Sequence, residues 1–258
     1  MSLEYAPRGL VGLLTPQANT TVEPEFSILM PAGFAHLNAR LVSPAATIEA
    51  RLLDYFAVAA TTARQFANAP LRALALACTG ASYLAGRERE AALLAALAGE
   101  FGVPAFTAAS AVVDALRVLR ARRIALASPY AAALTQASAD YWHSQGFEVV
   151  AVASATADAE QFHPIYSLGA GAAAGLLADL SGCDDIDAVL MLGTGMPTLA
   201  PLLAANAKGG VPVLSCMLSL GWKAVDVMEP GAWPLQGWLA GSHWQARLAA
   251  ACAREARA

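Results

Sequence analysis

The segment ACTGASY, residues 77–83, places a thiol where an apolar run ends and a helical pattern begins. A cysteine that opens a helix lies near the partial positive charge of the helix N-terminus, which favours the thiolate, the reactive form of the side chain. Thr79 and Gly80 follow Cys78 directly, and their N–H groups can hold a carboxylate or a developing oxyanion beside the sulfur. The alternative for an isolated cysteine of this kind is a small buried apolar side chain.

A second turn of similar composition, GTGMPT, begins at Gly193 after another apolar run. Thr194 and Gly195 offer backbone donors there, and the glycines allow a ligand to approach the backbone closely. An ordinary tight turn between a strand and a helix is the alternative. The turn is not a dinucleotide fingerprint, because the pattern GxGxxG followed by an acidic residue at a strand end is absent.

The segment TPQANTTVEPE supplies a further group that can bind an acid. The amide of Asn19 can both donate and accept hydrogen bonds. Thr20 and Thr21 are expected to cap the helix that follows, with Glu23 completing a capping box.

Two aromatic side chains follow later strand-like runs. Tyr130, in the segment SPY, has a phenol that can protonate or hydrogen-bond a substrate, and packing alone is its alternative role. His163, in FHPIY, lies near the end of the sixth predicted strand and within reach of the same region. A single histidine more often has a structural role.

Strand-like apolar runs alternate with helical patterns along the whole chain, which is typical of a parallel sheet covered by helices. We expect strands at residues 9–14, 35–42, 73–77, 104–107, 123–127, 147–153, 188–192 and 212–215. We expect helices at residues 48–67, 83–101, 110–119, 131–145, 165–180, 196–207 and 217–228.

Two pairs of segments indicate an internal repeat. LALACTGASY corresponds to VLMLGTGMPT, with 115 residues between Cys78 and Gly193, and GVPAFTAASAVVDAL corresponds to GVPVLSCMLSLGWKAV, 108 residues later. We therefore predict an α/β protein with two pseudo-symmetric parallel four-stranded sheets flanked by helices. Residues 1–120 form the first half and 121–228 the second, and a C-terminal helix within 229–258 packs back on the first. Because ligands bind beyond the carboxyl ends of parallel strands, Cys78 and Gly193 should face each other across a cleft between the halves.

The composition restricts the classes of partner. Apolar residues make up 57% of the 258 residues and charged residues 14%, and the net charge of −4 argues against nucleic acid as a ligand. No uncharged apolar run is long enough for a bilayer, and MSLEYAPRG lacks the features of a secretory signal, so we expect a cytoplasmic protein. The four cysteines form no CxxC pair and the four histidines stand singly, so neither a metal site nor a disulfide framework is expected. The apolar composition is compatible with a homodimer.

At these motifs the sequence resembles the maleate isomerase and arylmalonate decarboxylase branch of the aspartate/glutamate racemase superfamily. The resemblance covers nearly the whole chain and is most specific in TPQANTTVEPE, ACTGASYLAG, SPY and MLGTGMPTL with the following GVPVLS. It implies a small carboxylic acid as substrate, no cofactor, and carboxylates held by backbone N–H groups and small hydroxyls. It also implies that Cys78 matches the first-half cysteine, the nucleophile of the isomerases. Asn19 then matches their carboxylate-binding asparagine, and Tyr130 the tyrosine shared by isomerases and decarboxylases.

The sequence departs from the family pattern at Gly193, which stands where the resemblance places a second cysteine on the opposite face of the substrate. A racemase that uses two cysteines is therefore disfavoured. Cys216 does not replace the missing thiol, because it follows a different strand.

Three functions remain open. The first, favoured by the NTT segment, is cis–trans isomerisation of a maleate-like enedioate through addition of Cys78 to the double bond. The second is decarboxylation of a disubstituted malonate, in which Cys78 protonates an enediolate that is stabilised by donors from both turns (Thr79, Gly80, Thr194, Gly195) and by Tyr130. Decarboxylases of the family usually have glycine in the first half and cysteine in the second, so a product of opposite hand is implied here. The third is binding or sensing of a small acid without catalysis.

Overall fold

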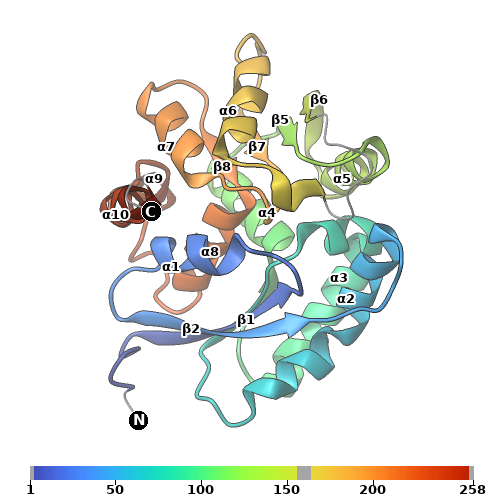
Figure 1. The fold of residues 1–258 in the computed structure, drawn as a ribbon, viewed down its shortest axis with the longest axis vertical. Helices are drawn as coiled ribbons and strands as arrows, with labels where there is room; N and C mark the ends of the chain where they lie inside the picture. Colours follow the sequence, from blue (N-terminus) through green and yellow to red (C-terminus); the bar gives the residue numbers. More distant parts are fainter. Residues whose placement is uncertain (1–2, 156–163, 256–258) are drawn as a thin grey trace.

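A computed structural model describes residues 3–155 and 164–255 of the chain. Figure 1 shows two α/β halves, with the N-terminal half below and the later one above. One four-stranded parallel sheet has the order β2-β1-β3-β4 and the other the order β6-β5-β7-β8, so the two halves repeat one topology. The predicted fold class is confirmed.

The elements alternate between strand and helix along both halves. The first half contains β1 (Gly9–Pro16), α1 (Val22–Leu29), β2 (Phe34–Leu41), α2 (Ile48–Ala63), the short η1 (Arg64–Phe66), β3 (Ala73–Leu76), α3 (Thr79–Phe101), β4 (Ala105–Thr107) and α4 (Ala108–Val118). The second contains β5 (Arg123–Ser128), α5 (Ala132–Ser144), β6 (Glu148–Ser154), η2 (Pro164–Ser167), α6 (Ala170–Asp179), β7 (Ala188–Met191), α7 (Leu199–Ala207), β8 (Val213–Ser215) and α8 (Cys216–Asp226). The short α9 (Leu235–Leu239) and the terminal α10 (Gln245–Glu255) follow.

Burial explains why the inner strands appear as continuous apolar runs. Every residue of β1, β3 and β7 is buried, as expected for parallel strands covered by helices on both faces. The edge strands β2 and β6 are only partly buried, whereas the opposite edge strands β4 and β8 are mostly buried.

The halves meet through equivalent helices. Helix α4, which follows β4, packs against α8, which follows β8. The ammonium of Lys223 on α8 lies 2.7 Å from the carboxylate of Asp114 on α4. Contact between the same element of each half is what an approximate twofold relation produces, and it brings the carboxyl ends of the two sheets together.

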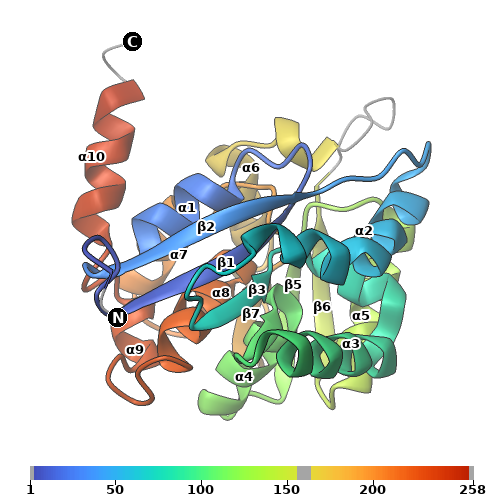
Figure 2. The same cartoon turned by 90° about the horizontal axis from the view of Figure 1, so that it is seen from below.

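The C-terminal segment contacts the end of α1. Arg247 donates from Nε to the carbonyl of Ile28 at 2.7 Å, and a ring nitrogen of His243 lies 3.2 Å from the carbonyl of Leu29. These bonds satisfy carbonyls that a helix end leaves without intrahelical partners. Figure 2 shows the rest of α10 projecting from the body. We propose the division at residue 120 with the residues after 228 assigned to the first half, since they satisfy its first helix.

Several helices differ from the sequence prediction. Helix α3 begins at Thr79, four residues earlier than expected, and Gly86 interrupts it with a φ of 78° and a ψ of 165°. Helix α1 was not among the predicted ranges, because its segment VEPEFSIL is short and contains a proline. The helix predicted over 165–180 is divided into η2 and α6.

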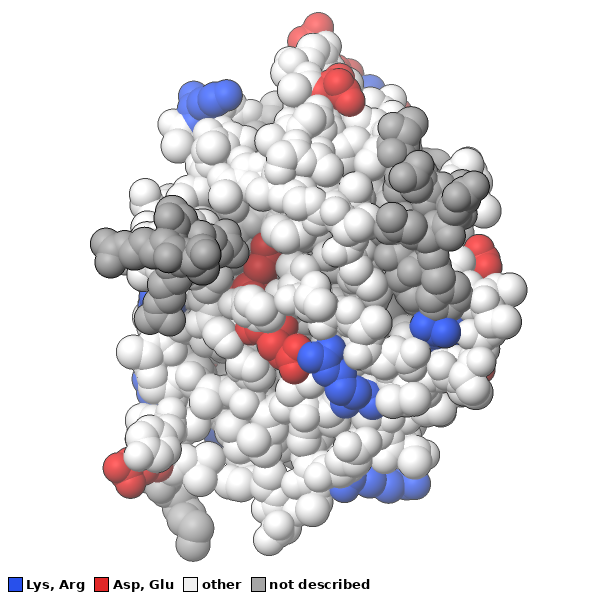
Figure 3. Space-filling model, in the orientation of Figure 1, with Lys and Arg blue, Asp and Glu red and all other residues white. Residues whose placement is uncertain are grey.

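The surface and the helices add two observations. In the described part of the chain, no helix is long and apolar enough to cross a membrane. Figure 3 shows a face that is mostly uncharged, with acidic and basic side chains next to one another near its middle.

Candidate active site

A cavity opens where the carboxyl ends of β1, β3, β5 and β7 meet between the halves. Its volume is about 660 Å³ when the open space at its mouth is counted. Both repeat turns contribute to its wall. The lining residues are Pro16, Asn19, Ile48, Glu49, Leu52, Cys78, Thr79, Gly80, Pro129, Tyr130, Ala131, Leu134, Ile165, Tyr166, Thr194 and Gly195.

Cys78 lines this cavity with only 4% of its surface exposed. Burial raises the pKa of its thiol to about 12, and the N–H of Ala81 opposes the rise only in part. The helix that Cys78 introduces is regular only as far as Gly86, so few aligned peptide groups act on the sulfur. Burial thus opposes the thiolate that the position of Cys78 at a helix start leads us to expect, and it favours the neutral thiol in the chain without a ligand.

Gly193 has a left-handed backbone with a φ of +87°. A Cβ atom there would lie 2.7 Å from Cδ1 of Ile165 and 3.0 Å from the hydroxyl oxygen of Tyr130. The position that corresponds to Cys78 in the second half therefore has neither the conformation nor the space for a cysteine.

Cys216 is fully buried and is not among the described residues that line the cavity. Its thiol lies 3.4 Å from the carbonyl oxygen of Met191, the last residue of β7, and burial raises its pKa to about 12. Contacts of the Cys216 thiol with the backbone of Gly193 and with the side chains of Thr79 and Tyr83 oppose this rise in part, so Cys216 lies directly behind the second turn without lining the cavity.

Tyr130 brings a hydroxyl to the space above Gly193. Its oxygen lies 3.0 Å from Oγ1 of Thr79, so this hydrogen bond joins the two halves. Burial raises the pKa of Tyr130 well above its usual value, which keeps the phenol protonated and able to donate. The ring of Tyr83 packs edge-to-face on that of Tyr130 with centroids 6.3 Å apart. The sequence does not indicate Tyr83 as a site residue, because its local pattern is that of any helix residue.

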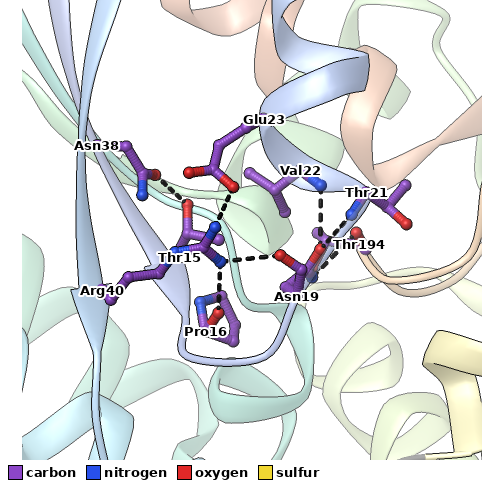
Figure 4. Close-up of polar contacts among 9 residues, drawn as sticks. All are labelled: Thr15, Pro16, Asn19, Thr21, Val22, Glu23, Asn38, Arg40 and Thr194. Carbon is purple, nitrogen blue, oxygen red and sulfur yellow. Dashed lines mark hydrogen bonds and ion pairs between the residues drawn. The ribbon is translucent and has the colours of Figure 1, made fainter.

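Asn19 is held on both sides of its amide, as Figure 4 shows. Its Oδ1 accepts from the N–H groups of Thr21 at 2.9 Å and Val22 at 3.0 Å, so Asn19 caps α1. Its Nδ2 donates to the carbonyl of Thr194 at 3.1 Å. The asparagine thus fixes the second-half turn directly, in addition to lining the cavity.

Two threonine hydroxyls strengthen this junction. Thr21 donates from Oγ1 to the carbonyl of Gly195 at 2.8 Å, and Thr194 donates from Oγ1 to the carbonyl of Ala77 at 2.9 Å. Thr21, from the first half, therefore holds the backbone of the second half at Gly195. Thr194, from the second half, holds the backbone of the first half at Ala77, next to Cys78.

The predicted capping box at the start of α1 is wrong. Thr21 is the N-cap residue but makes no side-chain capping bond, since its hydroxyl is bonded to Gly195. Thr20 is exposed, and Glu23 forms an ion pair with Arg40. Asn19 replaces the box, because its side chain reaches the first N–H groups of the helix.

Two further residues hold this region, and no sequence motif indicates either of them. Arg40, on β2, donates to the carbonyls of Pro16 at 3.1 Å and Asn19 at 2.8 Å, and so holds the loop after β1 (Figure 4). Glu25, on α1, also contacts the second half, but its carboxylate accepts from the N–H of Thr198 at 2.6 Å, whereas Asn19 and Thr21 donate to carbonyls. Both partners are distant in the chain, so no local motif indicates either contact.

The structure brings most of the predicted site residues together. The cavity wall contains Cys78, Thr79, Gly80, Asn19, Tyr130, Thr194 and Gly195, and Gly193 lies directly beneath the Tyr130 hydroxyl. His163 lies outside the described residues.

The cavity combines few polar groups with an apolar wall. Seven of its lining residues are apolar (Pro16, Ile48, Leu52, Pro129, Ala131, Leu134, Ile165), and Glu49 is the charged one among the described lining residues. A bound carboxylate therefore depends on N–H groups and hydroxyls, as the resemblance implies. No three acidic, histidine or cysteine side chains of the described part lie together as metal ligands would.

Comparisons with known proteins agree on one family. The family model described as arylmalonate decarboxylase matches residues 11–236. A maleate isomerase from Pseudomonas putida KT2440 is 29% identical over 86% of this chain and 94% of its own length.

Two solved structures are similar in fold. A cysteine-to-alanine variant of the maleate isomerase from Pseudomonas putida S16, solved with maleate, has a TM-score of 0.77 at 24% identity and covers 92% of this chain and 99% of its own. A liganded variant of arylmalonate decarboxylase, in which an early glycine is changed to cysteine and a later cysteine to serine, has a TM-score of 0.72 at 22% identity, covering 87% of this chain and 94% of its own.

Proposed function

The chain belongs to the arylmalonate decarboxylase family, and from that premise we propose that it decarboxylates a malonate with an apolar substituent, with Cys78 as the proton donor. The observation that carries the proposal is geometric: Cys78 lines the cavity, and Gly193, with its left-handed backbone, stands where the second half would place another thiol. Burial, which raises the pKa of the Cys78 thiol, favours its protonated form. Protonation of a carbanion needs one acid that still holds its proton. Addition to a double bond needs a thiolate.

The apolar wall favours the loss of carbon dioxide. A carboxylate bound against Leu52, Leu134 or Ile165 loses hydration, and neutral carbon dioxide does not need that hydration. The same side chains offer contact to an alkyl or aryl substituent on the α-carbon. The second carboxylate then lies at the polar end of the cavity, near the two repeat turns.

The proposed reaction balances with water as the only other participant. The bond between the α-carbon and one carboxylate breaks, carbon dioxide leaves, and the electron pair forms an enediolate on the remaining carboxylate. The N–H groups and hydroxyls of both turns, together with Tyr130, stabilise that charge. The Cys78 thiol gives its proton to the α-carbon and regains one from water. Because the proton arrives from the first half only, one enantiomer is expected.

The cysteine–glycine order supports this proposal further. The liganded decarboxylase variant likewise has a cysteine introduced early in its chain and one later cysteine removed, an arrangement similar to Cys78 with Gly193. We therefore propose a product whose hand is opposite to that of decarboxylases with the usual order.

Isomerisation of a maleate-like enedioate is the second candidate, and sequence similarity favours it, since the 29% identical relative is a maleate isomerase. In this reaction the Cys78 sulfur adds to one carbon of the double bond, the C–C bond rotates, and elimination of the thiolate restores the double bond. Asn19, which belongs to the NTT segment, does not separate the candidates, because its amide is bonded within the protein.

One assay separates the candidates: phenylmethylmalonate and maleate are incubated with the enzyme in parallel in D₂O and followed by NMR. The expected product is 2-phenylpropionate with a single deuterium at the α-carbon, and Cys183→Ala, at a half-buried cysteine outside the cavity lining, serves as the control. Fumarate without 2-phenylpropionate would reject the decarboxylase in favour of the isomerase. If neither acid reacts, both proposals fail for these substrates and a binding role gains support.

The pH dependence gives a second test. An acid with a pKa of about 12 stays protonated between pH 6 and 9, so Cys78 ionisation leaves the rate of decarboxylation unchanged over that range. A nucleophilic thiolate would instead give a rate that rises about tenfold per pH unit, since the thiolate fraction rises by that factor below the pKa.

A further inference from the structure

Glu25 is a buried carboxylate that joins the two signature motifs. It lies on α1 with 5% of its surface exposed. Its Oε1 accepts from the N–H of Thr198 at 2.6 Å and from that of Leu199 at 3.2 Å, and Thr198 Oγ1 donates to Oε2 at 3.2 Å. A residue of TPQANTTVEPE thus binds the far end of the GTGMPT turn.

These bonds provide the N-terminal cap that α7 lacks locally. The N-cap residue Thr198 makes no side-chain capping bond of its own, and the first N–H groups of a helix have no intrahelical partner. Glu25 supplies the acceptor from the other half of the molecule, and its charge is favourable at a helix N-terminus. The start of α7 is therefore set by α1.

The turn between Gly193 and Thr198 is consequently fixed at both ends. Asn19 holds the carbonyl of Thr194 and Thr21 that of Gly195, while Glu25 holds Thr198. Thr194 and Gly195 line the cavity beside Cys78, so an error in the position of this turn changes the site itself.

We propose that Glu25 is a positioning residue for the active site, which holds the Gly193–Thr198 turn in the geometry that binds the substrate carboxylate. The proposal rests on the proposed function for the identity of the bound group. Glu25 does not line the cavity and is not a catalytic residue.

The cost of burying Glu25 argues that stability does not explain its presence. Burial raises the pKa of Glu25 to about 7, and the hydrogen bonds from Thr198 and Leu199 oppose the rise. The folded chain therefore binds a proton here more tightly than the unfolded chain, whose pKa is near 4.5. The contribution of Glu25 to stability is greatest at low pH and is lost as the pH rises from about 4.5 to 7.

The test compares Glu25→Leu and Glu25→Gln with Glu90→Gln. Glu90 is a matched control, because it is 3% exposed and accepts from Thr107 and Tyr141 at 2.5 Å without touching either motif. Two readouts need no substrate: alkylation of Cys78 by iodoacetamide, followed on its peptide by mass spectrometry, and hydrogen exchange of the amides of residues 193–199.

Removal of all three acceptor contacts in Glu25→Leu should raise both the alkylation rate and the exchange rate about tenfold or more, because each lost bond loosens the turn. Glu90→Gln should leave both rates near wild type. On the substrate found by the NMR assay, Glu25→Leu should raise KM about tenfold and change kcat less, since carboxylate binding is weakened in ground and transition states alike. The melting temperature of Glu25→Gln at pH 8 should equal or exceed that of wild type, because the buried charge is removed.

Wild-type alkylation and exchange in a folded Glu25→Leu would overturn the proposal, whatever the enzyme turns over. If Glu25→Leu does not fold, Glu25→Gln decides: an amide oxygen is a weaker acceptor than a carboxylate, so exchange at Thr198 and Leu199 should rise at pH 8 by about two- to fivefold. Unchanged exchange there rejects the positioning role. Faster alkylation and exchange without turnover of either acid would reject the proposed function and leave the positioning role intact.

Discussion

The turn after β3 and the turn after β7 occupy equivalent places in the repeat and differ in what each offers. The first carries the Cys78 thiol and leads directly into α3. The second carries Gly193 in a left-handed conformation, and α7 begins only at Leu199. Side chains of α1 and its preceding loop hold the second turn from outside. The comparison teaches that one fold unit, used twice, can supply the reactive group on one side and a fixed binding wall on the other.

Cys78→Ala is the substitution with the largest expected effect on this division of roles. Turnover of the substrate should fall by about 10³-fold or more, because the proton donor is removed. Cys183→Ala should retain activity within about threefold of wild type, since Cys183 is a free cysteine outside the cavity lining. Steady-state rates with matched melting curves check this. Equal losses in the two variants would mean that the thiol at the first turn has no special role.

Tyr130→Phe is expected to have the next largest effect. The Tyr130 hydroxyl is bonded to Thr79 and lies next to Gly193. Loss of this hydroxyl should reduce kcat by about 10²-fold, which is typical of one oxyanion donor. Tyr141→Phe, which removes a buried hydroxyl that is bonded to Glu90 and lies outside the cavity lining, is the control and should change kcat by less than about threefold. A loss confined to KM would contradict a role in stabilising the enediolate.

Gly193→Cys attempts to make the two turns alike, and we expect it to destabilise the chain. The positive φ and the contacts with Ile165 and Tyr130 should cost about 1–3 kcal/mol in the free energy of unfolding, measured by urea titration. Gly193→Ala should cost nearly as much, whereas Gly80→Ala, whose added Cβ meets flexible atoms of Leu52, should cost less than about 1 kcal/mol. If Gly193→Cys is as stable as wild type and exchanges the α-proton of the product, the second turn can hold a thiol. The two turns would then differ in residue type and not in the backbone that each provides.

Thr21→Val against Thr20→Val tests the junction at the smallest scale. Thr21→Val removes the hydrogen bond to the carbonyl of Gly195. This substitution should lower the free energy of unfolding by about 1 kcal/mol and raise KM about fivefold. Exposed Thr20 should remain within about 0.5 kcal/mol of wild type in the same urea titration. Equal stabilities of the Thr21→Val and Thr20→Val variants would show that the Thr21 hydroxyl does not help to hold the second turn.

Local periodicity was sufficient to predict all eight strands and most helices, because buried parallel strands and amphipathic helices are encoded in contiguous residues. The start of α3 was predicted too late, since Thr79 and Gly80 read as a turn while their backbone is already helical. Helix α7 was predicted to begin near Met196, but its cap comes from Glu25, 173 residues away. Such long-range capping leaves no signal in a local window.

The candidate site was predictable where residue type alone indicates chemistry, as with Cys78, Tyr130 and the two glycine-rich turns. Its electrostatics were not, because the pKa of Cys78 is set by burial among groups from both halves. Arg40 and Glu25 were missed for a related reason: each acts on backbone carbonyls or N–H groups, which every residue type supplies and no motif records.

The left-handed Gly193 also bears on how such a site can change over generations. In a symmetric dimer of identical single units, every substitution appears on both sides of the shared cleft. Two units joined in one chain are encoded separately, so one unit can lose its sulfur while the other retains it. Covalent duplication thereby allows the two sides of the cavity to change independently of each other.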